Sequence, residues 1–141
     1  MTSLDQTIRG LFQNAALAVP GLPQPPNVAV ENVEFSSAVG TPWARFTMVP
    51  ASSRPYGVNA VTTAHRGLFL VDLYWPPNTG TGPIEAVASA VRKAFRPATR
   101  LVSDGVAAVV DYAETSKVME QKPDWLMCSV SVAWHCFSPL N

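Results

Sequence analysis

Apolar side chains recur along this chain at two spacings, one typical of helices and one typical of strands. The helical spacing predicts a first helix over Ser3–Ala18, with an apolar stripe formed by Leu4, Ile8, Leu11, Ala15 and Ala18. The same spacing predicts a second helix over Pro83–Phe95, with an apolar stripe formed by Ile84, Val87, Val91 and Phe95. Pro83 suits a first turn, because its missing N–H would have no partner inside the helix there.

Alternation with a period of two predicts strands between and after these helices. They cover Val28–Phe35, Trp43–Val49, His65–Trp75, Leu101–Val102, Val106–Tyr112 and Trp125–Phe137. Pro50–Ala64 is rich in proline and small residues, and we interpret it as a long loop. The order α-β-β-β-α-β-β-β predicts an α+β fold. We expect a single domain over residues 1–141, in which a mostly antiparallel, twisted sheet packs against two helices.

The strand His65–Trp75 has large apolar side chains on both of its faces. The face that we assign to the core is formed by Phe69, Val71, Leu73 and Trp75. The opposite face has no cover that the rest of the chain clearly supplies. Only 14% of all residues are charged, against roughly 25% in an average soluble domain. This deficit indicates that another protein covers part of the surface.

We therefore expect an oligomer or an assembly component, with a candidate subunit interface on the uncovered face. The residues of this candidate interface are Trp43, Arg45, Arg66, Leu68, Leu70, Asp72 and Tyr74. Trp43 is the one tryptophan that we do not assign to the core. It follows Pro42 and lies on the face of its strand opposite Phe46.

The overall charge argues against a dedicated nucleic-acid binder, which usually carries a basic excess. Ten basic and ten acidic residues cancel, and the pI is about 6.7. No apolar run approaches the roughly 20 residues that a membrane helix needs, and the N-terminal segment does not resemble a secretory signal. We expect a soluble protein made in the cytoplasm.

No constellation of residues predicts catalysis, a metal site or a cofactor. The two histidines, His65 and His135, lack a G-x-S-x-G partner motif, and we interpret them as solvated or interface residues. Cys128 and Cys136 share one strand at a separation of about 26 Å, too far for a disulfide. Without a C-x-x-C pair they are expected to be free, buried cysteines rather than zinc ligands.

Two further segments have alternative interpretations. The turn Gly80–Gly82 before the second helix could bind an anion, but no lysine follows at Walker-A spacing, which favours a plain strand-to-helix connection. A candidate charged contact patch lies at the end of that helix and comprises Arg92, Lys93, Arg96 and Arg100. Cations are favourable at a helix C-terminus, so a solvated helix end competes with contact to an acidic subunit or to a nucleic-acid backbone.

Four segments, in order along the chain, resemble one known family. They are ENVEF at 31–35, PWARF at 42–46, RGLFLVDLYWP at 66–76 with TGTG at 79–82, and VSVAW at 130–134. This pattern resembles the tail terminator (tail completion) proteins of long-tailed bacteriophages. Contact residues vary within this family, so none is transferred to this chain. The cysteine-, tryptophan- and histidine-rich last strand departs from the family pattern, and the resemblance therefore does not define the interface.

The resemblance implies a non-enzymatic virion protein that needs no cofactor and forms a ring, often a hexamer. Such a ring caps the tail tube, stops its polymerisation and joins it to the head connector. The implied partners are further copies of the chain, the tube protein and the connector protein, with DNA at most passing through the ring and no membrane. The implied location is the tail of the virion, assembled in the bacterial cytoplasm. The alternatives are a neck or head-completion protein of the same virion, or a small ligand-binding or enzymatic α+β domain that uses Gly80–Gly82 and His65.

Overall fold

The alternating segments of the sequence form one long, curled sheet with two helices on one of its faces. The computed structural model describes residues 4–30, 35–36, 40–56, 62–78, 80–103, 105–121 and 125–139. The helices are α1 (Leu4–Leu17) and α2 (Gly82–Ala94). The strands are β1 (Val28–Val30), β2 (Trp43–Tyr56), β3 (Thr62–Trp75), β4 (Arg100–Ser103), β5 (Val106–Thr115), β6 (Met119–Gln121) and β7 (Trp125–Pro139). The predicted α+β fold class is confirmed, and β6 is an additional strand.

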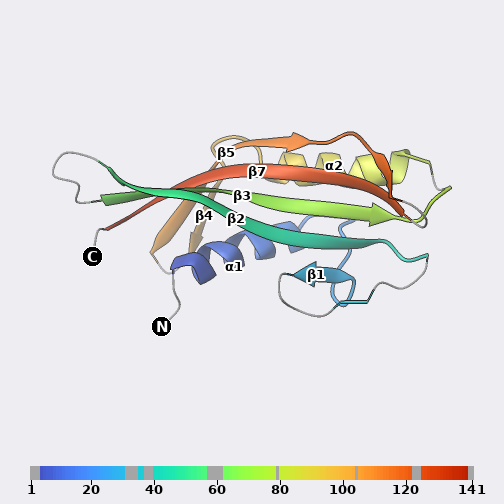
Figure 1. The fold of residues 1–141 in the computed structure, drawn as a ribbon, viewed down its shortest axis with the longest axis horizontal. Coiled ribbons are helices and arrows are strands. Elements are labelled where there is room, and N and C mark those ends of the chain that lie inside the picture. The colour runs from blue at the N-terminus through green and yellow to red at the C-terminus, as the bar shows by residue number, and fades with distance from the viewer. Residues whose placement is uncertain are drawn as a thin grey trace.

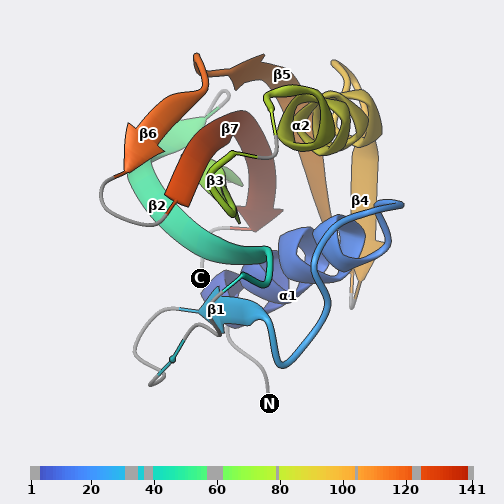
Figure 2. The same ribbon diagram turned by 90° about the vertical axis from the view of Figure 1, so that its right-hand side faces the viewer.

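Three strands of 14 or 15 residues, β2, β3 and β7, form the centre of the molecule (Figure 1). The strand order is β1-β2-β3-β7-β5-β4, and β6 also pairs with β7. In the described part of the chain, β1 pairs in parallel with β2, and the other strand pairs are antiparallel. Figure 2 looks along the strands and shows the sheet curling around the two helices.

The core lies between the helices and the inner side of this sheet. Its centre is Phe12 of α1, whose ring lies 5.3 Å from Phe69, 5.9 Å from Phe95 and 5.7 Å from Trp134, measured between ring centroids. The predicted alternation of β7 is confirmed. Its inward-facing residues Cys128, Val130, Val132, Trp134 and Cys136 are at most 4% exposed, whereas Leu126, predicted for the same face, is half-buried.

The apolar stripe predicted for the first helix is partly wrong. Ile8 is buried as expected, but the other buried residues of α1 are Thr7, Phe12 and Ala16, whereas Leu11 is half-buried and Ala18 is exposed. Ile8, Phe12 and Ala16 are spaced four residues apart and lie on the buried side of α1. This orientation buries the large ring of Phe12, which stabilises the fold more than burial of Ala15 and Ala18 would. The predicted start at Ser3 lies outside the described residues.

The long loop predicted for Pro50–Ala64 is also wrong. β2 continues to Tyr56 and β3 begins at Thr62, so the two strands form a long hairpin that extends past the helices (Figure 1). Among the described residues, β1 covers β2 only at residues 44–46, so most of β2 is an edge strand. Edge strands tolerate proline, which explains why Pro50 and Pro55 do not end β2. Residues 57–61, and residues 31–34 of the first predicted strand, lie outside the described residues.

Gly67 is the position where the sheet requires a residue without a side chain. A Cβ atom there would lie 2.6 Å from Cζ2 of Trp134 and 2.7 Å from the backbone oxygen of Val49. The absence of a side chain lets the indole of Trp134 lie directly against β3. The close packing that buries Trp134 to 4% exposure therefore depends on a glycine in the middle of a strand.

Both cysteines are free and buried, as predicted. The Cys128 thiol donates a hydrogen bond to the carbonyl oxygen of Ser116 at 3.4 Å. Burial raises the pKa of the Cys128 thiol and of the Cys136 thiol, and nearby Asp5 raises the pKa of Cys136 further.

These raised pKa values have a consequence for stability at alkaline pH. An unfolded thiol ionises near its ordinary pKa of 9.0, whereas the folded thiols stay protonated to higher pH. Ionisation therefore favours the unfolded chain, and the free energy of unfolding should fall as the pH rises above about 9. Urea unfolding at a series of pH values measures this fall, and the Cys128→Ala, Cys136→Ala double variant should show a smaller one. Rapid alkylation of both thiols by iodoacetamide in the native protein would contradict the burial.

Candidate assembly surface

The sheet face opposite the helices, which we call the outer face, carries all of the predicted interface residues. Both described helices pack on the other face, so neither of them covers it (Figure 2). From β2, β3 and β7, the outer face is formed by Trp43, Arg45, Thr47, Val49, Arg66, Leu68, Leu70, Asp72, Tyr74, Met127, Ser129, Ser131, Ala133 and His135. The register thus brings together all seven residues that the sequence proposed for the interface.

An apolar row crosses the outer face at its centre. Val49 of β2 pairs with Leu68 of β3, Leu68 pairs with Ala133 of β7, and Ala133 pairs with Tyr112 of β5. The two ends of this row are open to solvent, with Val49 39% and Tyr112 48% exposed. Cross-strand neighbours on one face touch each other, so the four side chains form a continuous apolar strip across four strands.

A charged row lies parallel to the apolar row. Arg45 pairs with Asp72, and Asp72 pairs with Ser129 of β7. The Ser129 hydroxyl donates a hydrogen bond to Oδ1 of Asp72 at 2.6 Å. This bond engages one carboxylate oxygen of Asp72, and the backbone register places Arg45 on the neighbouring strand directly opposite Asp72.

An aromatic cluster closes one end of the outer face. The rings of Trp43 and Tyr74 are stacked, with centroids 4.0 Å apart and an interplanar angle of 6°, and Phe35 and Trp125 pack around Trp43. Trp43 lies outside the main core cluster, as predicted, but it is only 7% exposed. The sequence placed Trp43 on the correct face, but the distant residues Phe35 and Trp125 bury it there.

Two polar groups lie beside this cluster, the exposed guanidinium of Arg45 and the half-buried hydroxyl of Tyr74. The Arg45 guanidinium carbon lies 5.4 Å from the centre of the Trp43 ring, within cation–π distance. Burial raises the pKa of the Tyr74 phenol, the Asp72 carboxylate raises it further, and Arg45 opposes both effects. Tyr74 therefore remains a neutral hydroxyl that can donate a hydrogen bond to a partner over the physiological pH range.

The two histidines lie at the other end of the long strands and make separate contacts. Nδ1 of His135 is 2.6 Å from Oδ1 of Asp111, and Nδ1 of His65 is 2.9 Å from Oγ of Ser53. Both pairs are between neighbouring strands of the sheet. Among the residues that the structure describes, no group of three histidine, cysteine, aspartate or glutamate side chains could hold a metal ion.

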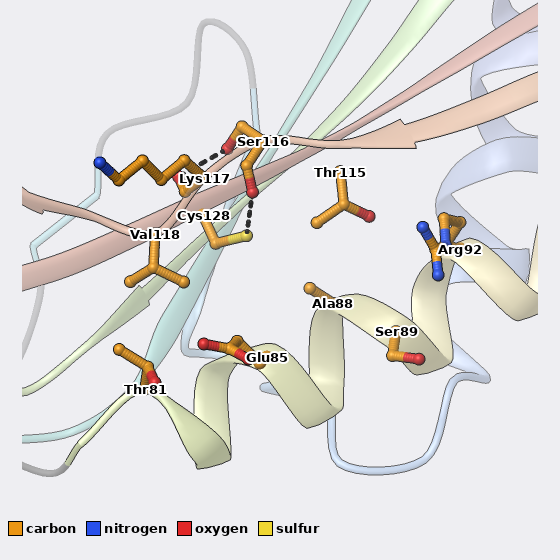
Figure 3. A pocket seen from close by; sticks show the side chains of 10 residues that line it. All are labelled: Thr81, Glu85, Ala88, Ser89, Arg92, Thr115, Ser116, Lys117, Val118 and Cys128. Carbon is orange, nitrogen blue, oxygen red and sulfur yellow. Dashed lines mark hydrogen bonds between the residues drawn. The ribbon is translucent and has the colours of Figure 1, made fainter.

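Three of the four residues of the predicted charged patch lie together. Arg92, Lys93 and Arg96 line a hollow of about 330 Å³ with Ser89, Pro97 and Ala113. Arg100 is not among its lining residues and instead pairs with Val109 at the sheet edge. A second hollow, of about 500 Å³, continues from Ser89 and Arg92 along α2 towards Thr81 and the residues that follow β5 (Figure 3).

The Gly80–Gly82 turn connects β3 to α2. Gly80 has a positive φ of 74°, Pro83 lies in the first helical turn, and Thr81 makes no side-chain cap hydrogen bond. The carboxylate of Glu85 lies in that same first turn. An acidic residue at the helix N-terminus already offsets the positive end of the helix dipole and would oppose an anionic ligand there.

In the described part of the chain, no helix is long and apolar enough to cross a membrane.

Comparisons with known proteins give one family and one fold. A family model described as phage tail terminator protein matches residues 7–134. A solved protein structure that carries no functional name is similar, with a TM-score of 0.71 and 23% sequence identity. The match covers 100% of this chain and 99% of that one. At this identity the likeness shows the fold alone. The comparison with curated proteins finds no significant match.

Proposed function

The chain belongs to the phage tail terminator protein family, and on that premise we propose that it forms a ring that caps the finished tail tube. It is a structural protein of a phage tail. In our proposal the ring is a hexamer, stops polymerisation of the tube protein and provides the surface that joins the head connector. It acts without catalysis or a cofactor, in a tail assembled in the host cytoplasm, and DNA only passes through its opening.

The observation that carries this proposal is the outer face. It combines an apolar row, Val49–Leu68–Ala133–Tyr112, with a parallel charged row, and neither helix covers it. Burial of a leucine side chain contributes roughly 1.5–3 kcal/mol, so covering this row would stabilise contact with a second subunit. The charged row would fix how that subunit is oriented.

A ring requires two different patches on each subunit, because a head-to-tail contact joins unlike surfaces. We propose that the outer face is one patch and that the projecting end of the β2–β3 hairpin of the next subunit is the other. Ser53, Arg54 and Pro55 near this end are exposed, and the hairpin extends past the helices (Figure 1). An element that reaches beyond its own core is placed to contact a neighbour.

Sedimentation velocity tests the proposal, with the protein alone and in the presence of preformed tail tubes. For the protein alone we expect a particle of six 15.1 kDa chains. If the protein assembles only on tubes, we expect six copies bound at each capped tube end. A protein that stays monomeric at high concentration and does not bind tubes would contradict the proposal. Binding to isolated head connectors but not to tubes would indicate a neck protein instead.

A further inference from the structure

Part of strand β5 has an open edge. β4 pairs with β5 only at Val106–Val109, and the chain before β4 continues this pairing as far as Val110. The pairing ends at Ala98, whose positive φ of 71° separates the segment beside β5 from the end of α2. Among the described residues, no strand pairs with Asp111–Thr115 on the side away from β7.

The backbone groups of Ala113 and Thr115 point to this open side. Val110 directs its N–H and C=O away from β7, to Thr99 and Ala98, whereas Ser116 directs its N–H to Ser129 of β7. Side-chain direction and hydrogen-bond direction alternate together along a strand. Ala113 packs against the core as Val110 does, so Ala113 and Thr115 present their N–H and C=O groups to the open edge.

The same two residues line the hollows beside α2. Ala113 lines the smaller hollow and Thr115 the larger one, and Ser89 and Arg92 line both. Figure 3 shows Thr115 opposite Ala88 and Ser89 of the helix. The open edge and the helix therefore border one groove, which we call the α2–β5 groove.

The groove is positively charged along α2. Arg92, Lys93 and Arg96 line it and are all exposed, and among the described residues none of them forms an ion pair. Lys117 adds a further cation, whereas Glu85, at the far end of the larger hollow, is the one acidic residue among the described residues that line the groove.

We propose that the α2–β5 groove binds an extended, acidic segment of another protein, which adds to β5 as a further strand. Ala113 and Thr115 would hydrogen-bond the backbone of this segment, and its carboxylates would face Arg92, Lys93 and Arg96. Strand addition of this kind takes affinity from the backbone ladder and specificity from alternate side chains. A nucleic-acid backbone would match the cations but would leave the open edge unpaired. This site is separate from the outer face and does not depend on ring formation.

A synthetic peptide tests the proposal with the full chain. The probe is an acetylated, fluorescently labelled Thr-Glu-Val-Glu-Thr-Glu-Val peptide, and its control has lysine in place of each glutamate. We expect the acidic peptide to bind and to slow amide hydrogen exchange in residues 111–117, while the lysine peptide does not bind. No binding of the acidic peptide, equal binding of both peptides, or protection of another strand would overturn the proposal. So would duplex DNA that protects this segment better than the peptide does.

Two variants separate the backbone contribution from the charge contribution. Arg92→Glu with Arg96→Glu should weaken acidic-peptide binding by about tenfold or more, because each tenfold step corresponds to only about 1.4 kcal/mol. Thr115→Pro removes the N–H that faces the open edge and should weaken binding similarly, whereas Thr115→Val keeps this N–H and should preserve binding. Circular dichroism checks that the variants fold. Unchanged affinity in the folded double charge variant would overturn the proposal.

Discussion

Replacement of Phe12 by alanine should lower the free energy of unfolding by about 3–5 kcal/mol. Phe12 is fully buried, and its ring is the contact that joins α1 to Phe69 of the sheet and to Phe95 at the end of α2. The variant loses the transfer free energy of the ring and leaves a cavity that α1, held between sheet and loops, cannot fill by a small shift. Urea unfolding followed by circular dichroism measures the loss.

Leu11→Ala is the matched control, because Leu11 precedes Phe12 on the same helix but is only half-buried. Its loss should be about 1 kcal/mol. Both variants must be compared with the unchanged protein at one concentration, because oligomerisation adds to apparent stability. Equal losses for the two variants would contradict this account. They would show that Leu11, which the sequence pattern assigned to the apolar stripe, is as important to the core as Phe12.

Replacement of Leu68 by aspartate should abolish self-assembly while the subunit stays folded. Leu68 lies in the apolar row between Val49 and Ala133 and is partly exposed in the isolated chain. In a closed interface the variant loses the burial of the part of Leu68 that is exposed in the isolated chain, at most about 1.5–3 kcal/mol at each contact, and adds an unpaired charge. Each contact should therefore weaken by at least about tenfold, and a ring multiplies the effect over its contacts. Sedimentation velocity measures the change in assembly.

Val102→Asp controls for the introduction of a charge on an exposed strand. Val102 is 60% exposed on β4, outside the apolar row. This variant should assemble like the unchanged protein. If Leu68→Asp and Val102→Asp reduce assembly equally, or if neither does, the outer face is not the contact surface. A Leu68→Asp variant that no longer unfolds cooperatively would show instead that Leu68 belongs to the core.

Helices and strands with regular side-chain spacing could be predicted from the sequence, because each one is specified by the residues of its own segment. The alternation of β7 and the stripe of α2 followed directly from side-chain spacing, and both are confirmed. The hairpin over Pro50–Ala64 was missed because proline and small residues normally indicate a loop, and only the edge position of β2 makes them compatible with a strand. That position depends on which strand becomes its neighbour, and local spacing does not contain this information.

The sequence likewise predicted some features of the candidate assembly surface and missed others. The face on which Leu68, Leu70 and Asp72 lie could be predicted, because alternation assigns each residue to a side. The burial of Trp43 could not, because Phe35 and Trp125 reach it from distant parts of the chain. Nor could the α2–β5 groove, since it requires knowing that β4 pairs with only part of β5. The three cations at and just after the end of α2, Arg92, Lys93 and Arg96, were the one signal of that groove in the sequence.

Growth of tail tubes in the presence of this protein is the most direct test of the proposed function. Purified tube protein would be polymerised with and without the chain, and electron microscopy would measure tube length and the ends of the tubes. We expect tubes that stop growing and carry a ring of extra density at one end. The Leu68→Asp variant should leave tubes as long as in the absence of the protein. Tubes of unchanged length without density at either end, in the presence of the folded, unchanged protein, would contradict the proposed function.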